Sequence, residues 1–292
     1  MIDRYLQNNI TWLDVQNPTQ DEVYEILNEC NIPREFGDDL ATANAKGEVI
    51  AKKGFLKTSI LFPIVKRTDI QHPHEVKFLV TNTHLVTIHF EDIGVLYQFA
   101  KEFEVLSLLN GKSKKTTPDQ LFIVMLNHFY NALHGKLDYL STKLSDIEDE
   151  IFKEHEREMV FELSHVSRRL ISFRQTLSTH KGILSKLEDA MSTAFIKKHG
   201  ASVEALLHHH KTVTGRMIAL FSTFDNLRST NNSLLTTKQN EVMKYLTIIS
   251  FITFPLMLFS SMFGMNTEHT PLLGRPYDFW IIIGIMILVS VT

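Results

Sequence analysis

Cysteine is nearly absent from this sequence, and there is no excess of basic charge. Cys30 is the single cysteine among 292 residues, which excludes an internal disulfide framework and any zinc or iron–sulfur site built from several cysteines. The 30 lysine and arginine residues are balanced by 33 aspartate and glutamate residues, for a formal net charge of −3. Nucleic acid is therefore not expected as the main partner.

The sequence also lacks the signatures of nucleotide-driven and nucleophilic chemistry. It contains no glycine-rich phosphate loop with its lysine, and no serine–histidine or cysteine–histidine arrangement typical of a hydrolase. Residues 1–5 do not have the basic and then apolar layout of a cleaved signal peptide. We therefore expect neither an enzyme nor a nucleotide partner, and we expect the bulk of the chain to stay in the cytoplasm.

Proline is missing from the 136 residues between Pro118 and Pro255. Because proline breaks helices and this stretch is rich in leucine, glutamate, lysine and methionine, it predicts two or three long helices. Thr117 and Pro118 form a helix start, and a break is expected near Gly200. A stripe with alternating spacings of four and three follows, made by Val213, Met217, Leu220, Phe224, Leu227, Asn231 and Leu234. It indicates either a coiled coil or packing of the helix against its own domain.

The first 112 residues have a different pattern, with short apolar runs of strand character. Residues 9–15 predict a strand, and Thr19 followed by Glu22 predicts a capped helix start. Two hairpins are expected, at residues 49–65 and 76–90, followed by a helix near residues 95–103. These elements predict a mixed α/β domain with a largely antiparallel sheet.

Residues 245–267 are 23 consecutive residues without a formal charge. At about 1.5 Å per helical residue, this run exceeds the roughly 30 Å of bilayer hydrocarbon and predicts a membrane span. A second apolar run of 14 residues, 279–292, is too short to cross alone. We expect the sequence to stop inside a second span. Both termini are expected in the cytoplasm, mainly because about 240 residues without a signal peptide precede the first span. Lys238 and Lys244 add a mild positive-inside bias.

A short signature follows the uncharged run: Gly264, Met265 and Asn266, with Glu268 two residues later. With the segments 240–249 and 254–256, and with 12–15 and 85–89 upstream, the sequence resembles the CorA family of divalent-cation channels, also called the two-transmembrane GxN family. The resemblance covers nearly the whole chain and is closest in its C-terminal part.

The resemblance implies a funnel-shaped homopentamer in the inner cell membrane. An α+β cytoplasmic domain is followed by a helical stalk that continues into a pore-lining first span, while the second span faces lipid. The segments are 1–112 for the α/β domain, 113–243 for the long helices and stalk, 244–266 for the first span, 267–278 for the external loop, and 279–292 for the start of the second span.

The signature would form the outer selectivity filter, made by Gly264, Met265, Asn266 and Glu268. Mg²⁺ holds its water tightly, so a fast pore cannot require full dehydration. Five neutral Asn266 amides could hydrogen-bond the water shell without trapping the ion, and Glu268 could concentrate cations outside. Without the family context, Asn266 is better interpreted as a helix C-cap, because asparagine tolerates the left-handed conformation there.

Polar and apolar residues recur at steps of three and four along one face of the first span and the helix just before it. Leu246, which matches a gate position of the family, lies beside that face. Fivefold symmetry would turn each residue into a ring, and the apolar rings would stop ions by dewetting. The alternative is that the methionine and phenylalanine side chains only pack against neighbouring helices. Phe254 stands where the family commonly has methionine. The predicted pore and gate residues are Asn240, Met243, Leu246, Thr247, Ser250, Phe254, Met257 and Ser261.

Family channels are held closed by Mg²⁺ bound between cytoplasmic domains through carboxylates. Ala205 occupies the stalk position where a carboxylate is expected, so the hypothesis falls on the adjacent Glu204 together with Glu91 and Asp92. Mg²⁺ would be both cargo and regulator, and Co²⁺, Ni²⁺ or Zn²⁺ are further possible cargoes. Two alternatives stay open: a Zn²⁺ or Co²⁺ transporter of the same superfamily, against which Met265 counts, and a membrane-anchored coiled-coil scaffold.

Overall fold

The computed structural model describes residues 1–7, 10–44, 46–63, 73–109, 116–195, 199–265, 274 and 276–291. The chain divides into two compact units, Met1–Arg228 and Ser229–Thr292. Helix α6 (Gly200–Phe263) contributes residues to both units.

A six-stranded sheet forms the centre of the first unit, in the order β1-β2-β6-β5-β4-β3. The strands are β1 (Ile2–Gln7), β2 (Ile10–Gln16), β3 (Glu48–Lys52), β4 (Phe55–Phe62), β5 (His74–Thr81) and β6 (His84–His89). Neighbouring strands are antiparallel, except that β2 runs parallel to β6 with Trp12 opposite Leu85. The prediction of a largely antiparallel sheet is confirmed, whereas β1 was not predicted.

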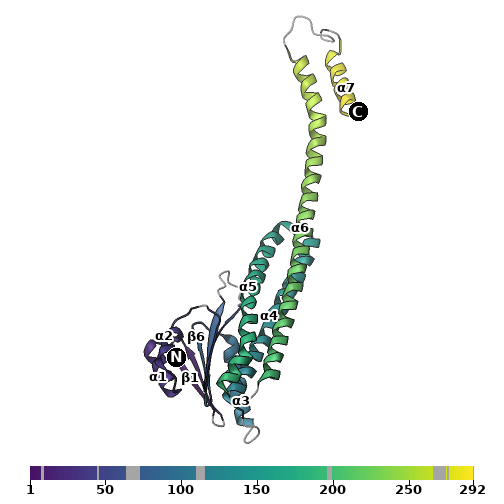
Figure 1. Cartoon of the computed structure of the whole chain (residues 1–292). Helices are drawn as coiled ribbons and strands as arrows, with labels where there is room; N and C mark the ends of the chain where they lie inside the picture. Colours follow the sequence, from purple (N-terminus) through teal and green to yellow (C-terminus); the bar gives the residue numbers. More distant parts are fainter. Residues whose placement is uncertain are drawn as a thin grey trace. The chain divides into compact units, whose positions relative to one another are not determined.

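Helices cover both faces of the sheet (Figure 1). On one face lie α1 (Gln20–Glu29), η1 (Arg34–Phe36) and α2 (Gly37–Leu40); on the other lie α3 (Gly94–Leu109), α4 (Pro118–Phe152) and α5 (Glu156–Ala194). Because side chains alternate along a strand, Trp12 packs with Phe99 and Phe103 of α3, while Leu13 joins the core under α1. Both β4 and β5 are buried along their whole length, and they carry buried polar side chains such as Lys57 and Lys77 beside the apolar ones.

The predicted helix starts are confirmed by their capping contacts. The Glu22 carboxylate accepts the Thr19 N–H at 2.7 Å, and the Thr19 hydroxyl accepts the Glu22 N–H at 3.3 Å. Pro118 is the first residue of α4. After α5 the next helix begins at Gly200, where the sequence predicted a break. The proline-free stretch therefore forms three long helices.

The stripe that begins at Val213 packs, in its first part, against its own unit. Val213 and Met217 are buried in the same apolar core as the sheet residues, and Leu220 packs against that core. Phe224 and Leu227 are also buried. Of the two interpretations left open by the sequence, packing against the same domain is the one the structure supports for this part of the helix.

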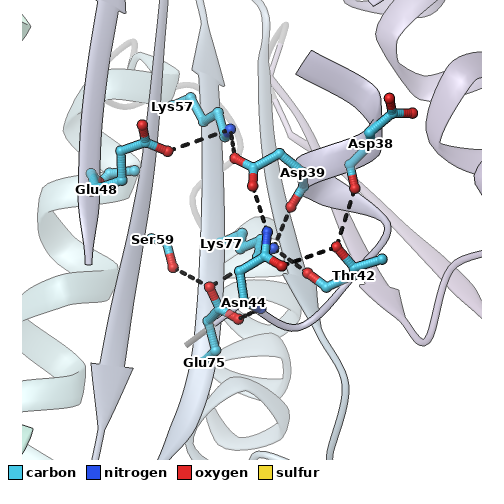
Figure 2. A network of polar contacts seen from close by, with 10 residues as sticks. Asp38, Asp39, Thr42, Asn44, Glu48, Lys57, Ser59, Glu75 and Lys77 are labelled. Carbon is cyan, nitrogen blue, oxygen red and sulfur yellow. Dashed lines mark hydrogen bonds and ion pairs between the residues drawn. The ribbon is translucent and has the colours of Figure 1, made fainter. Parts of the chain in front are cut away.

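Two buried lysines hold residues 38–44 against the sheet (Figure 2). The Lys77 ammonium donates to the backbone carbonyls of Asp39 and Thr42, and the Lys57 ammonium pairs with the Asp39 carboxylate. Burial lowers the pKa of Lys77, against the opposing effect of nearby carboxylates. A buried cation is tolerated only where its donors are satisfied, as they are here.

Glu75 provides the anionic part of the same network (Figure 2). Its carboxylate accepts the Ser59 hydroxyl at 2.5 Å and the Asn44 N–H at 2.9 Å. The segment between α2 and β3 is thus fixed by polar contacts with β4 and β5.

The second unit contains the C-terminal part of α6 and the helix α7 (Asp278–Val291). Among the described residues, α6 is the one helix long and apolar enough to cross a membrane, and α7 is a shorter apolar helix. Helix α6 ends at Phe263, earlier than the end of the uncharged run at residue 267.

Candidate ion pathway on helix α6

The predicted pore residues lie along one strip of α6. At about 100° per residue, seven of them fall within an arc of about 100°, and Leu246 lies at the edge of that arc. The seven are Asn240, Met243, Thr247, Ser250, Phe254, Met257 and Ser261. All eight predicted residues belong to α6, in the part of the helix that lies in the second unit.

This strip exposes large apolar side chains. Met243 is 53% exposed, Phe254 67% and Met257 65%. An apolar surface of this kind is unfavourable in water, so it needs lipid or other helices to cover it. Polar side chains on the same strip are typical of a helix that also meets water.

A concavity of about 380 Å³ interrupts the strip. The residues that line it are Leu246, Thr247, Ser250, Phe251, Phe254 and Pro255. Four of these six are predicted pore or gate residues. The hydroxyl of Thr247 donates to the Met243 carbonyl, and that of Ser250 donates to the Leu246 carbonyl, each at 2.8 Å.

The helix ends in a turn at the start of the predicted filter. The Gly264 N–H donates to the Ser260 carbonyl at 3.0 Å, and the Met265 N–H lies 3.4 Å from the Met262 carbonyl. Asn266 and Glu268 lie outside the described residues. The structure thus places Gly264 and Met265 directly after the apolar helix.

The predicted regulatory residues Glu91 and Asp92 lie between β6 and α3, in the first unit. The Glu91 carboxylate pairs with the His74 imidazole, and the Asp92 carboxylate accepts the Gln16 amide at 2.8 Å. Glu204 is exposed near the start of α6. Within the described residues, no group of three or more histidine, cysteine, aspartate or glutamate side chains could hold a metal ion.

Asp92 borders a pocket of about 430 Å³ that the sequence did not predict. Asp14 and His89 also line it, with 3.4 Å between the carboxylate and Nε2 of the imidazole. Burial lowers the pKa of His89, but the hydrogen bond and charge of Asp14 outweigh this and raise it overall. The two residues come from strands that are far apart in sequence, so no local pattern indicated the pair.

The chain matches the model of the family described as CorA-like Mg²⁺ transporter protein over residues 7–292. That match covers almost the whole chain. The chain belongs to the CorA family.

Two curated CorA relatives and a solved structure give the extent of the similarity. The chain is 21% identical to the cobalt/magnesium transport protein CorA of Methanocaldococcus jannaschii, over 96% of this chain and 87% of that protein. It is 22% identical to its namesake in Thermotoga maritima, over 73% of this chain and 60% of that protein. The structure of the CorA magnesium transporter from M. jannaschii matches with a TM-score of 0.82 at 19% identity, over 97% of this chain and 88% of that one.

Other solved structures share the fold at lower similarity. The cytoplasmic domain of ZntB from Vibrio parahaemolyticus matches with a TM-score of 0.55 and 9% identity, over 82% of this chain and 90% of that domain. This likeness concerns the fold alone.

Membership of the CorA family makes this chain a divalent-cation transport protein of the membrane. It also places the chain in a family of transporters, outside the known enzyme classes. The resemblance inferred from the GMN signature is thereby confirmed at the level of the family.

Proposed function

We propose that this CorA protein is a Mg²⁺ influx channel of the inner membrane. Five copies surround a central pore, which the strip of α6 lines, while α7 belongs to a second span that faces lipid. Both termini lie in the cytoplasm. The segments proposed from the sequence, with boundaries at residues 112, 243, 266 and 278, serve as cytoplasmic domain, stalk, first span, external loop and second span.

The observation that carries this proposal is the mixed character of the exposed strip of α6. The side chains of Met243 and Phe254 are more than half exposed. The polar residues Thr247 and Ser250 lie between them on the same face of the helix. A lipid-facing helix would not need these hydroxyls, and a helix facing only water would not carry the apolar groups. A narrow pore with alternating apolar and polar rings accounts for both.

The membrane potential alone can drive such influx. At 100 mV, inside negative, a dication gains about 4.6 kcal/mol, twice the value for a single charge. Asn266 amides, following Gly264 and Met265, would contact the water shell of the ion, and Glu268 would raise the local cation concentration. A neutral ring suits rapid passage because a carboxylate ring would bind Mg²⁺ more tightly and delay its release.

Flux into proteoliposomes tests the proposal. The full-length protein should admit Mg²⁺ at a rate that rises with an inside-negative potential, and Asn266→Ala should lower that rate by about tenfold or more. Asn232→Ala, at an exposed site on the same helix, is the matched control and should transport like the wild type. Native mass measurement should give five subunits. A dimer, or unchanged entry in Asn266→Ala, would contradict the pore and the filter, respectively.

Gating by cytoplasmic Mg²⁺ is the second part of the proposal. Since the described residues of one chain hold no ready metal site, the ligands would come from two copies: Asp92 with Glu91 from one and Glu204 from its neighbour. Replacing Asp92 and Glu204 together by alanine should weaken Mg²⁺ binding between subunits and leave the channel open at higher internal Mg²⁺. Unaltered Mg²⁺ binding in the double variant would remove these residues from the site.

A Zn²⁺ or Co²⁺ cargo is the rival function within the same fold. Met265 in the signature favours Mg²⁺ over this rival. Parallel flux measurements with Mg²⁺, Co²⁺, Ni²⁺ and Zn²⁺ at equal potential distinguish the two. Zn²⁺ entry far above Mg²⁺ entry would decide for the rival.

A further inference from the structure

The pocket of about 430 Å³ in the first unit lies between the sheet and the start of α3. The residues that line this β1–α3 pocket come from β1, β2 and β6 on one side and from α3 on the other. They include Asp3, Tyr5, Asp14, Leu96, Tyr97 and Ala100. A cavity of this size, with a mainly apolar wall and a few polar groups, is typical of a site for a small organic molecule.

The β1–α3 pocket lies where ligand sites commonly form in open sheets. Strands β2 and β6 are parallel, and their last residues, Gln16 and His89, both line the pocket. Gly94, the first residue of α3, lines it as well. Ligands of α/β proteins bind outside the carboxyl ends of parallel strands. The position of the pocket therefore follows from the topology of the sheet.

Two carboxylates are paired across neighbouring strands in this pocket. Asp3 of β1 is directly opposite Asp14 of β2 in the antiparallel register, which places their Cβ atoms about 5 Å apart on one face of the sheet. Like charges at directly opposite positions destabilise a sheet. None of the ion pairs among the described residues involves Asp3, so this repulsion stays uncompensated on its side. A positively charged ligand would remove it.

The basic groups of the pocket are already engaged. The Met1 ammonium donates to the Gln16 carbonyl at 2.9 Å, and Nε2 of His89 lies 3.4 Å from the Asp14 carboxylate. These two groups are fewer than the carboxylates that line the pocket, so its wall is negative even when both are charged. The carboxylates are those of Asp3, Asp14 and Asp92.

The rest of the wall fits an apolar body. Leu96 and Ala100 present aliphatic groups of α3, and Tyr5 faces the same space from β1. The Tyr5 ring stacks on Trp12 with 4.6 Å between the ring centroids, which fixes its position. Burial raises the pKa of Tyr5, and the charges of nearby carboxylates raise it further. The pocket thus combines apolar surface with a negative field.

A primary amine is complementary to this combination, whereas a bare metal ion is not. Within the described residues, no group of three or more histidine, cysteine, aspartate or glutamate side chains could hold a metal ion. An ammonium group donates three hydrogen bonds and can bridge two carboxylates about 5 Å apart. We propose that the β1–α3 pocket binds a primary organic amine, with its ammonium group between Asp3 and Asp14 and its apolar body against Leu96 and Ala100. This site does not depend on the proposed pore.

Binding of 2-phenylethylammonium to the full-length protein in detergent tests the inference. Isothermal titration should show saturable binding with a Kd below about 1 mM. The neutral analogue 2-phenylethanol has the same body without the charge and should bind at least about tenfold more weakly. Methylammonium has the charge without the body and should also bind at least about tenfold more weakly.

Two aspartate variants locate the ammonium group. Asp3→Asn should weaken binding of 2-phenylethylammonium by about tenfold, and so should Asp14→Asn. Asp3 is exposed, and its neutralisation removes a like-charge pair, so Asp3→Asn should unfold about 1–2 °C higher than the wild type without ligand. Asp21→Asn is the matched control, at an exposed site of α1 on the opposite face of the sheet, and should bind within about twofold of the wild type.

The contradicting outcomes are distinct from those for the proposed function. If 2-phenylethanol binds as tightly as the amine, or if both aspartate variants bind like Asp21→Asn, the ammonium group does not lie between Asp3 and Asp14. Binding lost in Asn266→Ala but kept in Asp3→Asn would place the amine in the proposed pore instead. A wild type that shows no saturable binding up to about 10 mM would also overturn the inference. Mg²⁺ flux is measured separately, so the channel stands if the pocket fails.

Discussion

The hydroxyl of Tyr130 lies 2.8 Å from Nδ1 of His180, inside the core between α4 and α5. Nε2 of the same ring lies 2.5 Å from the carbonyl of Leu61 in β4. Because a carbonyl accepts, Nε2 carries a hydrogen. Burial lowers the pKa of His180 to about 4, so at neutral pH Nδ1 has no hydrogen and accepts from the tyrosine. His180 is therefore neutral, and it connects two long helices with the sheet.

Acid should destabilise the first unit through His180. Burial lowers the pKa of His180 from 6.5 to about 4, so the unfolded chain binds the proton more readily. Stability should fall as the pH drops from about 6.5 to about 4, by up to about 3 kcal/mol. Thermal unfolding of the full-length protein in detergent, followed at several pH values, measures this loss. His180→Gln should flatten the dependence in that window, while His155→Gln, at an exposed turn, should leave it unchanged.

The protonation of His89 should affect folding stability in the opposite direction, with a loss of stability as the pH rises. Although burial lowers its pKa, Asp14 raises it above 6.5 overall, so the folded state holds the proton more tightly. The stabilisation is complete below about pH 6.5 and is lost as the pH rises through the raised pKa. In Asp14→Asn this loss should begin at lower pH, as seen in unfolding temperatures between pH 6 and 9. Asp3→Asn, on the wall of the same pocket, serves as control; an equal shift there would show that Asp14 has no special role.

Lys77→Met should loosen the segment of residues 38–44. Two backbone carbonyls would lose their donor in a buried site, which should cost roughly 2–4 kcal/mol. The segment should also become sensitive to limited proteolysis. Lys52→Met removes an exposed ion pair with Glu35 and a cation–π contact with Phe36, and it should cost about 1 kcal/mol. Comparable losses in the two variants would contradict the importance of the buried network.

Gly264→Ala should impair transport, whereas Gly284→Ala should not. A Cβ on Gly264 would lie 3.0 Å from the Ser260 carbonyl oxygen, and a backbone atom cannot move aside cheaply. The turn that leads into Met265 and the predicted filter would have to shift. Gly284 in α7 has open space around its Cβ position in the described chain. Initial Mg²⁺ flux of the two variants, at equal protein density in the liposomes, measures the difference.

Local patterns in the sequence predicted much of the fold. The capping box at Thr19 and the turn between β5 and β6 depend on neighbouring residues, so they could be predicted directly. Strand β1 was missed because Asp3, Arg4 and Gln7 mask its alternation at an exposed edge of the sheet. The parallel pairing of β2 with β6 joins segments about 70 residues apart, and no local signal encodes it.

The candidate site also has features that local sequence patterns predict and features that depend on the tertiary structure. The strip on α6 follows from helical periodicity alone, and the structure keeps those residues on one face. The direction of the Thr247 and Ser250 hydroxyls, by contrast, needed side-chain geometry. The pair of Asp14 and His89 depends on which strands become neighbours, so it became visible only with the sheet. The family signature indicated Asn266 and Glu268, whose roles rest on the flux experiments proposed above.

The contacts between β4 and α5 also constrain how the protein is made. Leu61 contacts His180, and the Gly54 N–H donates to the Ala194 carbonyl at 3.0 Å, so these contacts of the sheet form only after α5 has been synthesised. From there to the apolar run at residue 245, translation needs about 3–10 s at 5–20 residues per second. A small domain can fold within that time. The nascent chain therefore has time to pack α5 against its sheet before the apolar segment leaves the ribosome.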